Sequence, residues 1–390
     1  MLPIFFYLSL QMQRSQGCGF SILLLHVRFI SFIGRFIMQL LANNLRGKGL
    51  RLSPLKPVSS DSKNVKKLIS KCPMYAQTPL HECTDLANSL GIGSLHIKDE
   101  RPRMGLGSFK ALGATYAIAK MAAKSPLIND KPEKTLKGET FITASAGNHG
   151  LSVAAGARIF GANSVIYLSK TVPKEFAGRL REKGAEVIIE GADYEASMQA
   201  AAARAELEGW ILLSDSTWAG YSAGYDVMEG YLMMPEEVFT QMPISPTHIF
   251  LQAGVGGLAA AVTASVRSNW GTSSKIIVVE PSEAPAIMES IKVGKPVYAE
   301  GEASIMGRLD CKEPSHLALY CLAKEADFFM TLTDSEVLES IDELNKYGLS
   351  TSASGGAGYA GLVKALMNQS CNLDSNSHVL LFLSEGATDD

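Results

Sequence analysis

After residue 70, short hydrophobic runs alternate with longer stretches that are rich in alanine. The short runs contain β-branched and aromatic residues and predict strands, whereas the alanine-rich stretches predict helices. The predicted strands are Ser94–Lys98, Thr140–Thr143, Ser164–Leu168, Glu186–Glu190, Trp210–Leu213, His248–Leu251, Lys275–Val279 and Val379–Leu383. The predicted helices include Leu112–Ala123, Ser152–Phe160, Tyr194–Glu208, Leu258–Ser268 and Glu336–Asn345. This alternation predicts an α/β fold with mostly parallel sheets.

Small or polar residues follow four of the predicted strands. These segments are Ala144–Gly150, Ser214–Trp218, Gln252–Gly257 and Ser384–Thr388. Parallel sheets bind ligands at the carboxyl ends of their strands. We therefore expect the four segments to converge on one site along one sheet edge.

The first 60 residues contain no Asp or Glu. The apolar run Phe20–Leu41 is interrupted by His26, Arg28 and Arg35. A membrane span needs about 20 residues with few charges, so we do not expect a transmembrane helix. An organelle-targeting segment is one interpretation, and a mis-assigned start with Met38 as the initiator is the other. Residues 1–50 are therefore set apart from the predicted fold, and the compartment is either the cytoplasm or an organelle.

Overall composition excludes several classes of protein. Thirty-six basic and thirty-nine acidic side chains give a net charge of -3, which does not indicate a nucleic-acid partner. The six cysteines form no C-x-x-C pair in a chain that needs no disulfide framework, so we expect reduced thiols. The seven histidines show no H-E-x-x-H spacing, and we expect no metal site.

A glycine-rich turn lies between a predicted strand and a predicted helix, and consists of Gly254, Val255, Gly256, Gly257 and Leu258. Glycines let backbone N–H groups approach an anion closely, so the turn is a candidate phosphate cradle. A dinucleotide site remains an alternative, because Glu280 ends the next strand. The other alternative is a tight turn between strand and helix that binds no ligand.

Lys110 stands in Gly105–Ala111, just before a predicted helix. Most lysines are solvated surface residues, so the alternative interpretation is that Lys110 is a surface lysine near a helix start. However, a positive charge at a helix N-terminus is unfavourable, and the neighbouring residues are small or apolar. Both effects predict a lowered pKa for the Lys110 amine, which would make it a better nucleophile toward an aldehyde.

These residues resemble the fold-type II pyridoxal-phosphate (PLP) enzymes. Within that family the chain looks most similar to the diaminopropionate ammonia-lyases, and it also resembles the serine and threonine dehydratases. The resemblance covers about four-fifths of the chain, from Tyr75 onward. The segments that carry it are Asp99–Gly113, Gln252–Leu258, Ser304–Met306, Leu309–Cys311 and Ser384–Asp389.

The resemblance implies a two-domain fold like that of the tryptophan synthase β-subunit, with PLP in the cleft between the domains. The large domain would comprise residues 51–112 and 225–390, and residues 113–224 would form the small domain. It also implies a homodimer that acts on a small amino acid.

The resemblance assigns the cofactor-binding residues as follows. Lys110 aligns with the Schiff-base lysine, which also moves the substrate's Cα proton. The turn of Gly254, Val255, Gly256, Gly257 and Leu258 aligns with the phosphate loop. Asn148 aligns with the contact to the ring hydroxyl, unless it only caps a helix. Ser384 aligns with a hydroxyl near the pyridine nitrogen, unless it only occupies a turn. A hydroxyl there leaves the ring a weaker electron sink, which suits β-elimination.

The substrate-binding residues follow from the same resemblance. Ser145, Gly147 and Asn148 belong to the loop that receives the substrate carboxylate, at the start of a helix. Asp215 matches an acid that binds the β-amino group or assists its departure, and an Asx turn is the alternative. Diaminopropionate ammonia-lyases usually carry an Asp immediately before Gly147, as the base for the D isomer. This chain has Ala146, which cannot move a proton.

The resulting hypothesis is a catabolic PLP-dependent ammonia-lyase. It would convert 2,3-diaminopropionate, in the L form, to pyruvate and ammonia. A serine or threonine dehydratase is the alternative, because Ala146 matches the dehydratase version of the loop. A protein that binds PLP or an amino acid without catalysis is the second alternative.

Overall fold

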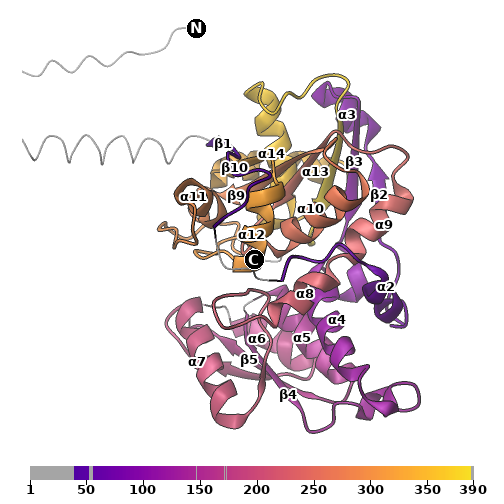
Figure 1. Cartoon of the computed structure of the whole chain (residues 1–390), viewed down its shortest axis with the longest axis vertical. Helices are drawn as coiled ribbons and strands as arrows, with labels where there is room; N and C mark the ends of the chain where they lie inside the picture. Colours follow the sequence, from indigo (N-terminus) through magenta and orange to yellow (C-terminus); the bar gives the residue numbers. More distant parts are fainter. Residues whose placement is uncertain (1–38, 52–55, 146, 171, 173, 388–390) are drawn as a thin grey trace, which may run out of the picture. The chain divides into compact units, whose positions relative to one another are not determined.

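The described strands form two sheets in the computed structural model of the chain, which describes residues 39–51, 56–145, 147–170, 172 and 174–387 (Figure 1). The larger sheet has seven strands in the order β1-β10-β9-β8-β11-β3-β2. These strands are β1 (Leu40–Ala42), β2 (Leu80–Glu82), β3 (Ser94–Asp99), β8 (His248–Gln252), β9 (Lys275–Pro281), β10 (Phe328–Leu332) and β11 (His378–Leu383). All neighbours are parallel except β1 and β2, which pair antiparallel at the two edges.

The smaller sheet has four parallel strands in the order β6-β5-β4-β7. They are β4 (Thr140–Ala144), β5 (Asn163–Leu168), β6 (Glu186–Ile189) and β7 (Ile211–Leu212). Figure 1 shows four helices grouped around β4 and β5: α4 (Lys110–Ala122), α5 (Asn148–Ile159), α6 (Lys174–Glu182) and α7 (Tyr194–Glu208). The α/β class predicted from the alternating pattern is confirmed.

Nine further α-helices and the short 3-10 helices η1 (Arg103–Gly105), η2 (Pro126–Ile128) and η3 (Pro132–Lys134) complete the described elements. The α-helices are α2 (Lys63–Ile69), α3 (Thr84–Leu90), α8 (Gly224–Gly230), α9 (Met233–Gln241), α10 (Gly257–Asn269), α11 (Ala286–Val293), α12 (His316–Glu325), α13 (Asp334–Lys346) and α14 (Ala353–Met367). Local sequence explains several of their ends. Thr333 and Glu336 form a reciprocal capping box at the start of α13, and the left-handed Gly294 ends α11.

Both faces of the larger sheet are covered, because its central strands are apolar on both sides. In β8, Ile249 and Leu251 pack into one core cluster with α10 and α12, whereas Phe250 packs into a second cluster with α13 and α14. The smaller sheet is arranged similarly: Phe141 packs toward α4 and α5, and Ile142 packs toward α7. A parallel sheet buried on both faces produces the continuous apolar strands seen in the sequence.

All eight predicted strands are confirmed, with ends that shift by one or two residues. Three further strands were not predicted. β1 and β2 have three residues each, which is too short for a recognisable pattern. β10 (Phe328–Leu332) is apolar enough to be recognisable, but the sequence analysis did not identify it.

β1 lies within residues 1–50, which the sequence analysis set apart from the fold. Its Leu40 and Leu41 pair with β10, and the Asn43 amide donates hydrogen bonds to carbonyls at the end of α12. The described residues from Gln39 onward belong to one compact unit, and the domain boundaries at 113 and 224 stay a prediction. The targeting-segment and Met38 interpretations concern residues that lie outside the described part. Within the described ranges, no helix is long and apolar enough to cross a membrane.

Candidate active site

Lys110 is the first residue of α4, which begins two residues before the predicted start at Leu112, and the turn before it is tied to the end of β11. Phe109 N donates to the Ser384 carbonyl at 3.0 Å, and Gly386 N donates to the Gly107 carbonyl at 3.1 Å. An isolated antiparallel bridge joins Ser108 to Glu385 between these two bonds. Backbone pairing therefore places Lys110 beside the strand end that carries Ser384.

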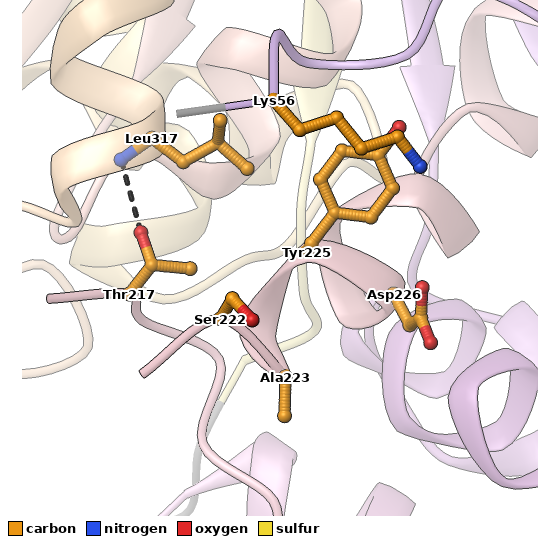
Figure 2. A pocket seen from close by; sticks show the side chains of 7 residues that line it. All are labelled: Lys56, Thr217, Ser222, Ala223, Tyr225, Asp226 and Leu317. Atoms are coloured by element: carbon orange, nitrogen blue, oxygen red, sulfur yellow. Dashed lines mark hydrogen bonds between the residues drawn. The ribbon is translucent and has the colours of Figure 1, made fainter. Parts of the chain in front are cut away.

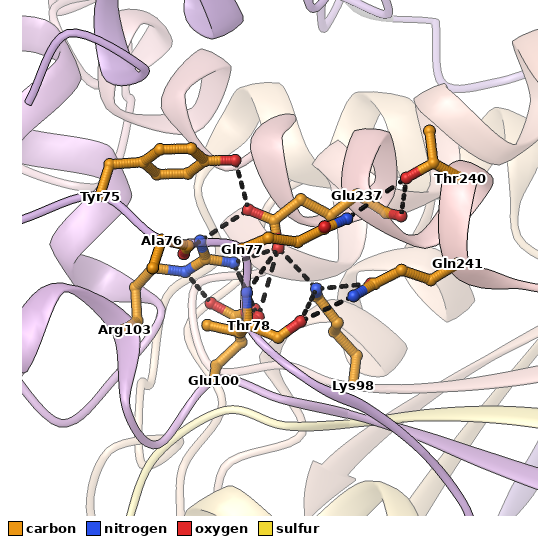
Figure 3. A network of polar contacts seen from close by, with 10 residues as sticks. All are labelled: Tyr75, Ala76, Gln77, Thr78, Lys98, Glu100, Arg103, Glu237, Thr240 and Gln241. Atoms are coloured by element: carbon orange, nitrogen blue, oxygen red, sulfur yellow. Dashed lines mark hydrogen bonds and ion pairs between the residues drawn. The ribbon is translucent and has the colours of Figure 1, made fainter.

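A buried ionic network fixes the chain upstream of Lys110 (Figure 3). The side chain of Arg103 is fully buried. It contacts Glu100, which follows β3, at 2.7 Å, and Glu237 of α9, also at 2.7 Å. Lys98 at the end of β3 also pairs with Glu237. Figure 3 shows Thr78 among these side chains; its hydroxyl donates to Glu100 and accepts from Arg103. The network links β3, α9 and the turn that leads to Lys110.

The Lys110 amine forms an ion pair with the carboxylate of Asp215, which follows β7. Burial alone would lower the pKa of this amine, but Asp215 outweighs burial and raises it. The predicted lowering is therefore wrong for the protein without a bound aldehyde. Burial would raise the pKa of Asp215, yet Lys110 and then His149 hold it well below its usual range. Thr217 N donates to Ser315 Oγ at 3.1 Å rather than to Asp215, so the Asx-turn alternative is wrong.

The glycine-rich turn leads directly into α10. Gly256 has φ +95° and precedes the first helical residue, Gly257. A Cβ on Gly256 would lie 2.9 Å from Ile287 Cδ1, and one on Gly254 would lie 2.9 Å from Cys311 Sγ. No described side chain caps the first N–H groups of α10. These donors at a positive helix end fit a phosphate group.

Other features of the site also fit PLP. The buried Ser108 hydroxyl has no hydrogen-bond partner among the described residues, and the buried Tyr231 hydroxyl lies beside the Lys110 amine. Phe109 and Tyr231 pack their rings at 4.8 Å between centroids, and the Lys110 amine lies 5.3 Å from the Phe109 ring centroid. Aromatic rings and hydroxyl groups beside a lysine are suited to an aromatic cofactor with polar substituents.

Ser384 lies at the end of β11, beside β8. Its Oγ accepts a hydrogen bond from Gln252 Nε2 at 3.1 Å, which leaves its own O–H free to donate to a ring nitrogen. Gln252 is held by the carbonyls of Gly355 and Phe382, at 3.0 and 2.8 Å. Ser384 is therefore positioned by a neighbouring strand rather than only by its own turn.

The loop before α5 is organised by Ser145. Its Oγ accepts from the backbone N–H groups of Gly147 and Gly150, at 3.2 and 3.1 Å. Gly147 is the N-cap of α5, so the alternative that Asn148 only caps a helix is wrong. The Asn148 amide instead donates to Glu385 across the site. Ala146 lies outside the described residues.

The sequence analysis missed three further residues of the site, which are Glu385, Arg308 and His149. Glu385 accepts hydrogen bonds from Asn148 and Ser352, and its Oε2 lies 3.1 Å from Arg308 Nε. Burial raises the pKa of Glu385. The buried His149 donates from Nε2 to the Leu213 carbonyl at 2.8 Å. Glu385 and His149 lie within segments noted in the sequence, but nothing in the sequence indicated their contacts.

The four strand ends do converge, but not along one sheet edge. β8 and β11 are neighbours in the larger sheet, whereas β4 and β7 are neighbours in the smaller one. The Lys110–Asp215 and Asn148–Glu385 contacts bring the two pairs together. The expectation that all four ends lie on one sheet edge is therefore wrong. The ends belong to two sheets, and contacts of Lys110 and Asn148 join them.

Glu280 does not support a dinucleotide site. Its fully buried carboxyl accepts hydrogen bonds from Ile287 N and Met288 N, at 2.7 and 2.8 Å. Burial raises its pKa to about 8. The side chain thus caps α11 inside the protein and is not available to a ribose.

A separate cavity of about 320 Å³ lies close to the segment that carries Asp215 (Figure 2). In Figure 2, Lys56 lies over the ring of Tyr225, with its Nζ 4.0 Å from the ring centroid, and Thr217 Oγ1 accepts from Leu317 N. None of the predicted site residues lines this cavity. It is therefore not part of the candidate active site.

Comparisons with known proteins agree with this geometry. The family model "Pyridoxal-phosphate dependent enzyme" matches residues 72–385. Diaminopropionate ammonia-lyase of Salmonella typhimurium is 34% identical, over 82% of this chain and 87% of its own. The Escherichia coli K12 protein of that name is 32% identical, over 85% and 89%. A solved structure of the E. coli enzyme in complex with D-serine has a TM-score of 0.82 and 30% identity, covering 90% of this chain and 95% of that one. The chain therefore belongs to the family of pyridoxal-phosphate-dependent enzymes.

Proposed function

We propose that this chain is a PLP-dependent ammonia-lyase that converts L-2,3-diaminopropionate to pyruvate and ammonia. The observation that carries the proposal is the contact between Lys110 and the ionised carboxylate of Asp215. Relatives named for this activity cover most of the chain and support the substrate class.

When bound, PLP supplies an aldehyde that accepts an amine and a ring that withdraws electrons from the substrate's Cα. The glycine-rich turn before α10 would hold the phosphate, and Ser384 Oγ, which accepts from Gln252, would donate to the ring nitrogen. Asn148 would contact the ring hydroxyl. Lys110 Nζ, after giving up its proton, would bind the aldehyde and later take the proton that leaves Cα.

Asp215 determines which leaving group the site can assist. In the structure the Lys110 ammonium keeps the buried Asp215 carboxylate ionised, and once Lys110 holds the cofactor a β-ammonium group of the substrate would take over that charge pairing. An ammonium group leaves as neutral ammonia and needs no further proton. A leaving hydroxyl group carries no positive charge to pair with the carboxylate and must also receive a proton. The local electrostatics therefore favour an amine over a hydroxyl as the leaving group.

The residue before Gly147 favours the L isomer. Opposite isomers present the Cα proton to opposite faces of the cofactor, so each needs a base on its own side. Lys110 provides one such base, whereas Ala146 carries no group that can accept a proton. The chain is thus expected to act on one isomer.

The dehydratase alternative keeps some support from Ala146, since the sequence Ser145–His149 has the dehydratase form. The test is a substrate panel of L- and D-diaminopropionate, L-serine and L-threonine, with pyruvate or oxobutyrate and ammonia measured together. We expect turnover of L-diaminopropionate with two ammonia molecules per pyruvate. Turnover of both L-hydroxyamino acids without that of L-diaminopropionate would contradict the proposal. Absence of turnover with all four would favour the non-catalytic binding alternative.

A matched pair of variants tests the role of Asp215. Asp215→Asn removes the ionised carboxylate, and we expect it to lower turnover of L-diaminopropionate by about 100-fold or more. The control is Asp226→Asn, which removes a carboxylate that is 38% exposed and pairs with Lys120. Equal losses in the two variants would show that Asp215 has no special role.

The assembly, pathway and compartment belong to the same proposal. We expect a homodimer that works in amino-acid catabolism, in the cytoplasm or in an organelle if the N-terminal segment is a targeting sequence. Light scattering of the purified holoenzyme gives its mass directly and would reveal a monomer or a larger oligomer.

A further inference from the structure

Arg308 occupies a turn whose backbone is firmly held. Its own N–H donates to Ser354 Oγ at 3.1 Å, and Leu309 N donates to the Met306 carbonyl at 2.7 Å. Met306 is fully buried and Leu309 is 7% exposed, so both anchor the turn in the core. The segments that carry the family resemblance end at Met306 and resume at Leu309, so the resemblance assigns no role to Arg308.

The Arg308 side chain extends across the candidate active site toward the loop before α5. A Cβ on Gly147 would lie 3.9 Å from both Cγ and Nε of Arg308. The Arg308 carbonyl oxygen lies 3.2 Å from the position of a Cβ on Gly254. Arg308 therefore lies between the proposed carboxylate loop and the proposed phosphate loop.

The guanidinium group of Arg308 has donors to spare. Its only charged partner within the described ranges is Glu385, whose Oε2 lies 3.1 Å from Nε. Nε is buried and lacks an aligned hydrogen bond, and neither terminal nitrogen has a hydrogen-bond partner among the described residues. The side chain is 26% exposed, so it is a partly enclosed group rather than a surface arginine. A guanidinium fork with a free edge matches a carboxylate by two parallel hydrogen bonds.

We infer that Arg308 binds the α-carboxylate of the amino-acid substrate, with Glu385 as the positioning residue that holds its guanidinium group. Charge complementarity supports this assignment, which rests on the proposed function. The proposed substrate carries a negative α-carboxylate and a positive β-ammonium group. The site offers Arg308 beside Gly147 for the first and Asp215 for the second. The helix start at Asn148 adds a favourable dipole for the carboxylate.

Binding of L-alanine and L-alaninamide to the holoenzyme, measured by calorimetry, tests the inference independently of the reaction. L-Alanine has the α-carboxylate but no leaving group, and the amide lacks only the negative charge. Arg308→Gln should weaken L-alanine binding by about 10- to 100-fold and leave L-alaninamide binding unchanged. Arg308→Lys keeps the charge but loses the fork, so its affinity for L-alanine should be intermediate.

Arg204→Gln is the matched control, since it removes a guanidinium group that is 45% exposed on α7 and should leave both affinities unchanged. Unchanged L-alanine affinity in Arg308→Gln, or equal weakening of both ligands, overturns the inference. L-Aspartate is titrated as a third ligand. If Arg308→Gln weakens the binding of L-aspartate but not that of L-alanine, Arg308 contacts a side-chain carboxylate, and the inference is overturned. Because neither L-alanine nor its amide undergoes elimination, these results stand whether or not L-diaminopropionate is the substrate.

Discussion

The buried ionic network before Lys110 predicts a large difference between two adjacent glutamates of α9. Glu237 is 2% exposed and contacts Arg103 at 2.7 Å and Lys98. The network holds two cations, Lys98 and Arg103, against two anions, Glu100 and Glu237. Glu237→Gln preserves the shape of the side chain but leaves a net buried positive charge. Breaking a buried pair in this way costs about 3–5 kcal/mol.

Glu236→Gln is the matched control, because Glu236 pairs with Lys66, whose side chain is 57% exposed. Loss of that surface pair should cost less than about 1 kcal/mol. Urea unfolding of both variants, followed by tryptophan fluorescence and far-ultraviolet circular dichroism, gives the two free energies of unfolding. Equal losses in the variants would refute the reasoning that burial and charge balance decide the cost.

The pH dependence of the same variant gives a second test of this reasoning. Burial alone would raise the pKa of Glu237, but Arg103 and Lys98 lower it below its ordinary value of 4.5. The carboxylate therefore stabilises the fold above that value, and this stabilisation is lost as the pH falls through the depressed pKa. The difference in unfolding free energy between the native chain and Glu237→Gln should shrink in acid. A difference in unfolding free energy that stays constant with pH would show that the charge of Glu237 does not stabilise the fold.

Three further predictions concern the candidate site and its surroundings. Lys110→Ala should abolish turnover and the visible absorbance of the bound cofactor; unchanged turnover would refute every catalytic role given to Lys110. Ala146→Asp should add turnover of D-diaminopropionate, assayed as pyruvate, because it supplies a proton acceptor that the native chain lacks. Glu280→Gln should flatten the pH profile of thermal stability. Burial raises the pKa of Glu280 to about 8, so its protonated form stabilises the fold fully below about pH 4.5, and this stabilisation is lost as the pH rises through about 8.

Patterns that are local in the chain could be predicted from the sequence. The eight strands and the helix predicted from Leu112 depend on neighbouring residues, and the structure contains them, with the helix beginning at Lys110. The glycine-rich turn was recognisable because its glycines lie between a predicted strand and a predicted helix, and Gly256 does adopt a positive φ before α10. β1 and β2 were not recognisable, because three residues carry too little pattern to distinguish a strand from a loop.

Features that depend on distant contacts could not be predicted from the sequence. The pKa of Lys110 was expected to fall, since only its burial and helix position are visible locally. Asp215, 105 residues further along the chain, reverses the direction. The strand pattern predicted the convergence of four strand ends but placed them on one sheet edge, because strand order is a property of the whole fold; only the family resemblance set residues 113–224 apart from the rest.

The charge balance around Glu385 predicts how Arg308→Gln will respond to pH. Burial raises the pKa of Glu385, while Arg308, Ser352 and Asn148 act in the opposite direction. Removal of the cation leaves Glu385 with less opposition to burial, so its pKa rises further and the carboxyl takes up a proton more readily. The variant should therefore be nearly as stable as the native chain at low pH and lose stability relative to it as the pH rises. Thermal midpoints of the two proteins between pH 5 and 9 would show a widening gap; a gap that narrows with rising pH would mean that Arg308 does not offset the charge of Glu385.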